Sequence, residues 1–460
     1  MSDPTADGVT PVVPSAVSLG YRDISAERVF ADLVHAGRTN SVSARPEWPA
    51  DAADASVGQP PFAKLVPPTG PHDLLPPPAP AIATDAPRQS WFRRSIRRSA
   101  GWIRNGFRSF WLITLLALMT ALPIIQLIAF GYLLDVAGRL AKGGNLRDAL
   151  DWLRPAGQLG LAILATLLVS LPIGLLGHWA TVGEVISPGS PQARAMRSGA
   201  ILLVVVGTLH LAWALARGGR WWHYLWPQPL RFLREAWRPR TWADAADRGA
   251  EWFGEWQFGR RFWLGLRGAI ATLIWLLPAT VIILANRHGQ SGLAGLIGGL
   301  AFLALGITLL YLPMLQAHFA AQGRFAAMFE VRKIRGDFRR APWAWLAALI
   351  LTLVVLPIPL YLLKIEPPPP ELVWLPTWLF IAFMLPARIA CGLALRRAGH
   401  RPEPQGWPAA LSRWLVRSLT IPVVAVYLLF VFLSQYTSWD GLQTWVHQHA
   451  VLVPAPFVGS

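Results

Sequence analysis

The sequence predicts an all-α, polytopic transmembrane helical bundle with interfacial amphipathic helices and a disordered N-terminal tail. Two observations predict this class. Of the 460 residues, 53% are hydrophobic and only 15% are charged, whereas about a quarter of the residues of a soluble protein are usually charged. The apolar residues also gather in blocks, each near the roughly 20 residues that cross about 30 Å of hydrocarbon.

Residues 1–90 form the first segment, and they are rich in Pro, Ala, Ser and Asp without a sustained apolar period. Such a segment cannot bury enough surface to offset the entropy lost on ordering, so we expect it to be disordered and cytosolic. Residues 25–37 are an exception, because Val29, Phe30 and Leu33 share one helical face. This stretch could be a docking helix for a partner or a transient helix.

Residues 91–110 place apolar side chains and arginines at helical spacing. The pattern predicts a basic amphipathic helix in the membrane plane, with its apolar side at the acyl boundary and its arginines among lipid phosphates. The candidate contacts with anionic lipid in this helix are Arg93, Arg94, Arg97 and Arg98.

Eight apolar blocks follow within residues 111–434, the predicted transmembrane helical domain, and none of them contains Asp or Glu. The blocks cover about 111–134, 159–182, 199–216, 263–285, 293–316, 343–363, 372–392 and 416–434. Prolines lie inside or at the ends of several blocks. In a membrane such prolines kink helices at a tolerable cost, because neighbouring helices and side chains satisfy the freed carbonyls.

The placement of positive charge predicts the topology. The connections after the third, fifth and seventh blocks are basic, whereas the tail at 435–460 has no Lys or Arg. We therefore expect these connections in the cytosol and a short extracytoplasmic C-terminal tail. If the arginines within 91–110 are also cytosolic, eight crossings would place the basic third connection outside the cell, against this charge pattern. Because Pro123 bisects the first block, we favour seven crossings and a re-entrant first block over eight crossings.

The residue pattern of the third connection, residues 217–262, predicts two interfacial helices. Leu230, Leu233 and Trp237 share one face, and a second apolar stripe follows Thr241, the expected N-cap. The surface could bind lipid headgroups or a partner, or it could simply anchor the helices. The candidate headgroup contacts here are Arg231, Arg234 and Arg238.

The fifth connection repeats this pattern, with Phe325, Met328 and Phe329 beside a run of basic residues. The basic residues of this connection are Arg324, Arg332, Lys333, Arg335, Arg339 and Arg340. They could bind anionic lipid in the same way, or they could form an ordinary positive-inside loop.

Polar residues inside or beside the blocks are Gln126, His210 and Gln316. Polar groups at that depth warrant a functional hypothesis, although a hydrogen bond to a neighbouring helix is the commoner role. Gly295 and Gly299 have the spacing of a close helix–helix contact. The sequence contains no catalytic motif, phosphate-binding glycine loop or metal-ligand cluster, so we expect no catalytic residue, metal or other cofactor.

Several strings together point to a known family. They include LPIIQLIAFGYLLDVAGRLAKGG at 122–144, LWPQPLR at 225–231, FWLGLRG at 262–268, FEVR at 329–332, RRAPWA at 339–344, FMLPAR at 383–388 and QHAVLVPAPF at 448–457. The chain thereby resembles uncharacterised bacterial multi-pass membrane proteins similar to the domain of unknown function 4013 family. The resemblance implies no activity and no site.

These observations favour a multi-pass protein of the bacterial inner membrane that acts as a non-enzymatic scaffold or accessory subunit. The alternatives are a transporter or channel, and an intramembrane lipid-handling enzyme. A water-lined cavity at the three polar residues would favour the transporter or channel, and a cluster of Arg, Tyr and Trp around a headgroup-sized cleft would favour the enzyme. The net charge is +17, and the basic residues flank the apolar blocks. This placement indicates anionic lipids rather than nucleic acid as partners. Unknown proteins are the other expected partners.

Overall fold

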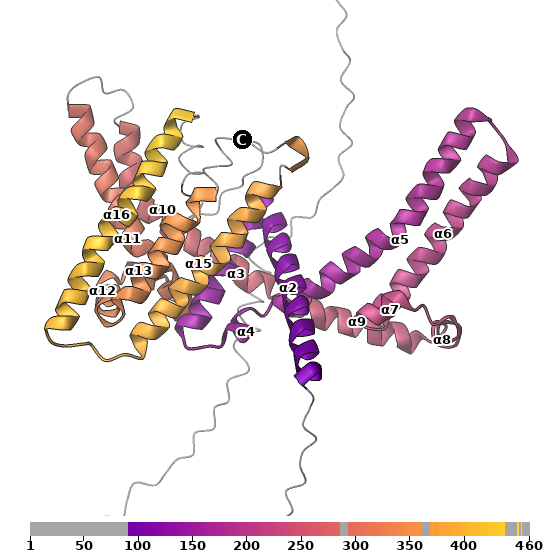
Figure 1. The fold of residues 1–460 in the computed structure, drawn as a ribbon, viewed down its shortest axis with the longest axis horizontal. Coiled ribbons are helices and arrows are strands. Elements are labelled where there is room, and N and C mark those ends of the chain that lie inside the picture. Colours follow the sequence, from indigo (N-terminus) through magenta and orange to yellow (C-terminus); the bar gives the residue numbers. More distant parts are fainter. Residues whose placement is uncertain are drawn as a thin grey trace, which may run out of the picture. The chain divides into compact units, whose positions relative to one another are not determined.

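The computed structural model describes residues 91–285, 293–359, 369–372 and 374–437, with His449 and Leu452. These residues form helices and no strand (Figure 1). The helices of the first half are α2 (Trp91–Ala121), α3 (Gln126–Ala141), α4 (Leu146–Ala149), α5 (Leu153–Ile186), α6 (Pro191–Ala216), α7 (Trp221–Leu225), α8 (Pro229–Glu235) and α9 (Pro239–Gly254). Those of the second half are α10 (Phe258–Ala285), α11 (Leu293–Gln322), η2 (Phe325–Phe329), α12 (Val331–Arg340), α13 (Pro342–Ile350), η3 (Leu351–Val355), η4 (Pro370–Leu372), α15 (Leu375–Gly399) and α16 (Trp407–Thr437).

Among the described residues, seven helical stretches are long and apolar enough to cross a membrane. They are Leu153–Ile186, Pro191–Ala216, Pro239–Ile282, Leu296–Gln322, Pro342–Pro359, Leu375–Gly399 and Trp407–Leu433. Each of them contains one of the second to eighth apolar blocks, or most of it. The predicted fold class, a helical membrane protein, is confirmed. The N-terminal segment 1–90, with its expected helix at 25–37, lies outside the described residues.

The first apolar block, 111–134, is broken in two by the turn between α2 and α3. Pro123 lies in this turn, and Ile124 has a φ of 69°. The part of α2 from Arg108 to its end at Ala121 and the part of α3 from Gln126 to Arg139 each contain 14 residues. Each is therefore about 20 Å long, which is less than about 30 Å of hydrocarbon. In Figure 1, α2 leads away from the lower edge and α3 returns toward it. This geometry fits a re-entrant hairpin.

The basic residues of α2 belong to the same helix as the apolar residues that follow. α2 continues from Trp91 to Ala121 without a break at residue 110. The amphipathic segment expected at 91–110 is therefore continuous with the apolar residues 111–121 in one helix.

α3 packs against α10, α11 and α15, and eleven of its 16 residues are buried. Glycines allow its crossing with α10. A Cβ atom added at Gly131 would lie 1.9 Å from the carbonyl oxygen of Arg261, and one added at Gly265 would lie 1.9 Å from that of Leu127. The two backbones therefore approach too closely for any side chain at these positions.

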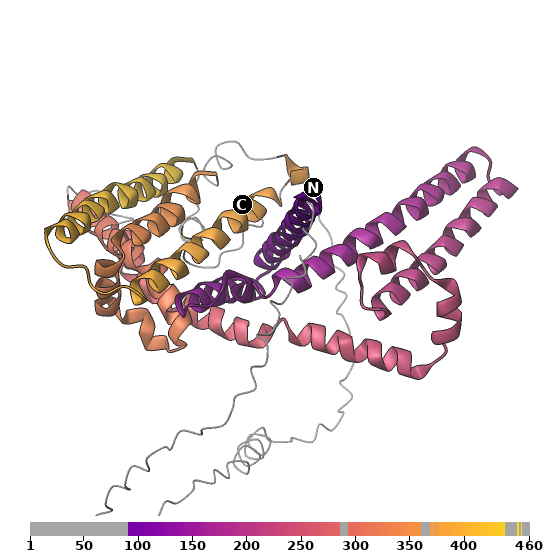
Figure 2. The ribbon, with the colours of Figure 1, turned by 60° about the horizontal axis from the view of Figure 1, so that its bottom comes forward.

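α5 and α6 lie side by side in both views (Figure 1, Figure 2). Large apolar side chains on both helices, such as Leu171 and Leu202, are exposed. Exposed apolar side chains along a long helix are expected where the solvent is lipid.

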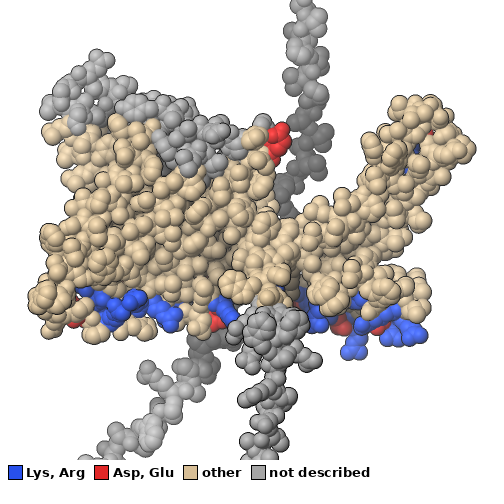
Figure 3. All heavy atoms as spheres, viewed as in Figure 1, with Lys and Arg blue, Asp and Glu red and all other residues tan. Residues whose placement is uncertain are grey.

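Lys and Arg side chains gather along one edge of the structure (Figure 3). The connections that contain α4, α7 to α9 and α12 lie at this edge, as does the connection 400–406 between α15 and α16 (Figure 1). The arrangement agrees with the alternation of basic connections that the sequence predicts.

The third connection contains three short helices, α7, α8 and α9, in which no residue is buried. Leu230, Leu233 and Trp237, which the sequence places on one interfacial face, are all exposed. α9 begins at Pro239 with Arg238 as its N-cap, so the expected cap at Thr241 is wrong. Proline favours the first helical position because its φ already suits a helix and its missing N–H is not needed there.

Part of the C-terminal tail packs inside the helical domain. His449 and Leu452 are both buried, and the carbonyl oxygen of Leu452 accepts a hydrogen bond of 2.9 Å from the side-chain amide of Gln316. Leu452 therefore lies in the interior of the helical domain.

Candidate functional site

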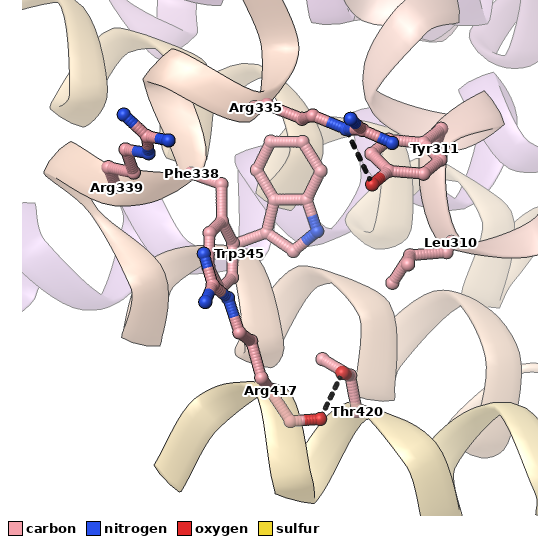
Figure 4. A pocket seen from close by; sticks show the side chains of 8 residues that line it. All are labelled: Leu310, Tyr311, Arg335, Phe338, Arg339, Trp345, Arg417 and Thr420. Atoms are coloured by element: carbon pink, nitrogen blue, oxygen red, sulfur yellow. Dashed lines mark hydrogen bonds between the residues drawn. The ribbon is translucent and has the colours of Figure 1, made fainter. Parts of the chain in front are cut away.

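A hollow of about 310 Å³ lies between α11, α12, α13 and α16, and its lining includes three arginines and three aromatic residues (Figure 4). The lining residues are Leu310, Tyr311, Arg335, Phe338, Arg339, Trp345, Arg417 and Thr420. Its volume is at the lower end of the range of about 300–1,000 Å³ that is usual for small-ligand sites.

α12 contributes the arginines of one wall. Arg335, Phe338 and Arg339 recur at steps of three and four residues, so they share one face of this helix. Ile334 and Asp337 are buried instead. The local sequence thus packs Ile334 and Asp337 inward and presents a cationic, aromatic face to the hollow.

The guanidinium groups contact aromatic rings more than carboxylates. Arg335 donates a hydrogen bond of 3.1 Å from Nε to the hydroxyl of Tyr311, and Arg417 lies 5.8 Å from the ring centre of Phe338. Arg339 has a distant ion-pair partner in Glu403, at 3.9 Å between Nη1 and Oε1. Among the described residues, Arg335 and Arg417 have no carboxylate within ion-pair distance. Positive charge in the hollow is therefore largely uncompensated.

Trp345 forms the inner wall and is only 3% exposed. Its ring meets that of Phe338 edge-on, with 5.7 Å between the ring centres. The indole Nε1 is buried and has no hydrogen-bond partner among the described residues. Figure 4 shows this nitrogen on the side of the ring that faces Leu310 and Tyr311. A buried donor without a partner costs about 1–3 kcal/mol, so a ligand that accepted this hydrogen bond would gain from it.

The polar groups of the lining are almost all donors. The three guanidinium groups and the indole N–H can only donate, and the hydroxyl of Thr420 donates to the carbonyl oxygen of Arg417 at 2.7 Å. The ligand that suits such a surface is an anion rich in acceptor oxygens, and arginines are well suited to bind phosphate. None of the eight lining residues is Asp, Glu, His, Cys or Lys, and Tyr311 is the one lining residue of a type that acts as a general acid or base.

The α16 wall of the hollow borders a lipid-facing surface. Arg417 lies within the candidate span Trp407–Leu433, and its neighbours Leu415, Leu419 and Ile421 are exposed. An arginine in such a position can reach toward the membrane interface.

The lipid contacts expected from the sequence lie outside this hollow. Arg93, Arg94, Arg97 and Arg98 belong to the first part of α2, where side chains are not described. In α8, Arg231 pairs with Glu235 through its Nε at 2.9 Å. Arg234 and Arg238 are exposed. These two remain candidates for headgroup contacts at the surface.

The three polar residues of the apolar blocks make different contacts. His210 Nε2 lies 2.7 Å from the carbonyl oxygen of Tyr224, which ties α6 to α7. Gln316 is fully buried, donates to Thr272 at 2.7 Å and accepts from Arg388. Gln126 is partly exposed at the start of α3, and its Oε1 has no partner among the described residues. Each of the first two is thus a tether between segments of the chain.

The glycine pair of the fifth block is described only in part. A Cβ atom added at Gly299 would meet no atom within 4 Å, and the surroundings of Gly295 lie outside the description. Within the described residues, Gly299 therefore makes no close helix contact.

The sequence did not predict a partly buried network of charges. Arg139 bridges two carboxylates, Asp135 at 2.7 Å and Asp151 at 2.9 Å, and the fully buried Arg261 reaches Asp151 at 2.5 Å. Arg260 adds a contact of 3.2 Å to Asp135. Asp135 directly follows the first apolar block, but the arginines from α10 lie far along the chain. The network joins α3, α10 and the start of α5, which is a structural role.

The comparisons with known proteins extend this description. Residues 240–365 match the family model described as "Protein of unknown function (DUF4013)". The resemblance noted from the sequence is thereby confirmed for that stretch, which contains the α11, α12 and α13 walls of the hollow but not the α16 wall. No curated protein and no solved structure matches the chain.

Proposed function

We propose that this protein is a non-enzymatic membrane scaffold that holds the headgroup of an anionic phospholipid in the hollow between α11, α12, α13 and α16. The observation that carries the proposal is that three arginines, Arg335, Arg339 and Arg417, line one aromatic-walled hollow. Guanidinium groups bind phosphate oxygens through short, charge-assisted hydrogen bonds.

The proposed location is the bacterial inner membrane, with the basic edge of the structure toward the cytosol. Two observations support this orientation: the basic residues gather at one edge (Figure 3), and the basic connections alternate along the chain. Basic connections favour the cytosolic side, and the anionic lipids of the cytosolic leaflet attract basic segments.

A lipid-handling enzyme is the second candidate, because a cluster of Arg, Tyr and Trp around a hollow of this size is also what such an enzyme would need. The lining favours binding over catalysis, because it holds no Asp, Glu, His, Cys or Lys. Its two hydroxyls, of Tyr311 and Thr420, are engaged in hydrogen bonds with Arg335 and with the carbonyl oxygen of Arg417. A transporter built around the polar residues of the blocks has less support, because His210 and Gln316 are engaged in separate contacts.

The experiment compares retention of anionic lipid by the full-length protein and its variants. Protein in nanodiscs that contain phosphatidylcholine and an anionic phospholipid is analysed by native mass spectrometry. We expect Arg335→Gln and Arg417→Gln each to lower the apparent affinity at least tenfold, because a hydrogen bond to a charged group contributes about 1.5–3 kcal/mol.

Arg332→Gln and Arg413→Gln are the matched controls, since each removes one charge from the same helix outside the lining. They should retain the lipid. Equal loss in controls and lining variants would show that only the overall positive charge attracts lipid, and the proposal would then fail.

A further inference from the structure

We infer that the ligand of this hollow carries a terminal phosphate, a phosphomonoester, rather than the phosphodiester of most phospholipids. This inference rests on the proposed function and specifies the ligand of the same site. It follows from three properties of the lining: the directions from which donors approach, the charge, and the near absence of acceptors.

Donors surround the hollow on several sides. Arg335 and Arg339 come from α12, Trp345 from α13 and Arg417 from α16. In Figure 4, Arg335 points toward Tyr311 and the guanidinium group of Arg417 lies beside Phe338. A phosphomonoester presents three terminal oxygens, whereas a phosphodiester presents two and continues into a second substituent. Donors from three helices match the three oxygens of a terminal group.

The charge of the hollow matches a dianion. Three guanidinium groups line it, and the carboxylate of Glu403 lies 3.9 Å from only one of them. A phosphomonoester carries a charge of about −1.5 to −2 near neutral pH, because its second pKa is about 6. A phosphodiester carries a single negative charge and would leave more of the positive charge uncompensated.

The lining offers almost nothing for the hydroxyl or ammonium groups of larger headgroups. Only the hydroxyls of Tyr311 and Thr420 can accept hydrogen bonds, and the hydroxyl of Tyr311 already accepts one from Arg335. The remaining wall is apolar, with Leu310 and Phe338. A glycerol or inositol hydroxyl would lose its hydrogen bond to water, and an ammonium group would face guanidinium groups.

The test uses the full-length protein in nanodiscs with phosphatidic acid as the phosphomonoester, phosphatidylglycerol as the anionic phosphodiester, and inorganic phosphate as the soluble source. Phosphatidic acid should bind at least about tenfold more tightly than phosphatidylglycerol, the factor that one further charge-assisted hydrogen bond supplies. This preference should shrink as the pH falls through about 6, where the phosphate gains its second proton.

Two tryptophan variants report on the indole donor. Trp345→Phe keeps an aromatic ring but removes the N–H donor together with the five-membered ring of the indole, so it should weaken the binding of phosphatidic acid several-fold. Trp343→Phe is the control, because the indole of Trp343 donates to Ser412 at 2.9 Å and lies outside the lining.

The outcomes separate this inference from the proposed function. Equal binding of the two lipids, with both lost in Arg335→Gln, would overturn the phosphomonoester inference and leave the lipid site standing. Absence of any lipid bound by the wild-type protein would overturn both. Binding of inorganic phosphate without phosphatidic acid would overturn the lipid source, and an unchanged preference across the pH range would contradict a dianionic ligand.

Discussion

Ile124 shows at the residue scale how the first apolar block is turned back. Its φ of 69° lies in the left-handed region, where a β-branched residue is a rare outlier. Left-handed backbone costs about 1–2 kcal/mol for a residue with a Cβ atom. The side chain is 69% exposed, so packing against the described chain does little to offset that cost.

Replacing Ile124 by glycine should therefore raise the stability of the protein in detergent by up to about 1 kcal/mol, because glycine adopts positive φ without steric strain. Thermal unfolding monitored by circular dichroism measures the change. Ile125 has helical backbone angles, with φ of −64°, and Ile125→Gly should lower stability. If both variants behave alike, the strain assigned to Ile124 is absent.

His223 provides a residue-scale prediction on pH. Burial lowers the pKa of His223 below its usual value, and the positive charges of Arg217 and Arg220 lower it further. The folded segment therefore binds a proton less readily than the unfolded one, and its stability must fall as the pH drops below the unfolded value of about 6.5.

Hydrogen exchange of α7, corrected for the intrinsic rate, should show less protection at about pH 5.5 than at about pH 8. His223→Gln should remove the difference. Protection that rises on acidification would contradict the sign of this pKa shift.

At the scale of elements, the crossing of α3 and α10 depends on two backbones in contact. Gly131 and Gly265 each leave no room for a Cβ atom. Gly131→Ala and Gly265→Ala should each lower stability by about 1–3 kcal/mol or more, the usual cost of overpacking. Thermal unfolding of the purified variants measures this loss.

Gly299→Ala is the informative comparison, because a Cβ atom there would meet nothing within 4 Å. In a helix interior alanine is more favourable than glycine by about 1 kcal/mol, so we expect equal or higher stability. The glycine spacing predicts close helix packing within a chain or between chains, and a loss of an oligomer in this variant, seen by crosslinking, would instead support packing between chains. A loss of monomer stability would contradict the described surroundings of Gly299.

The helices themselves could be predicted because their signals are local. Block length and hydropathy identify the seven candidate spans, and Pro123 marks the break between α2 and α3. The hollow could not be predicted in the same way. Arg335 and Arg339 share a basic loop with other arginines, and Arg417 resembles the flank of a span. Only the packing of four helices, over 100 residues apart at the extremes, brings these arginines together.

At the scale of the whole molecule, a re-entrant α2–α3 hairpin puts Ser99 and Asn145 on the same side of the membrane. Single cysteines at these positions, in a Cys391→Ala background, can be labelled in intact and permeabilised cells. We expect both to react only after permeabilisation, and a cysteine at Ser187 to react from outside. Reaction of Ser99→Cys and Asn145→Cys from opposite sides would mean that the first block crosses.

The central claim is that the hollow lined by Arg335, Arg339 and Arg417 binds an anionic lipid headgroup. The most direct test is an electron cryomicroscopy structure of the full-length protein in nanodiscs that contain phosphatidic acid. We expect density for a phosphate group within hydrogen-bond distance of the Arg335 and Arg417 guanidinium groups and of the Trp345 indole nitrogen. An empty hollow, or one filled by acyl chain while phosphates lie elsewhere, would contradict the claim.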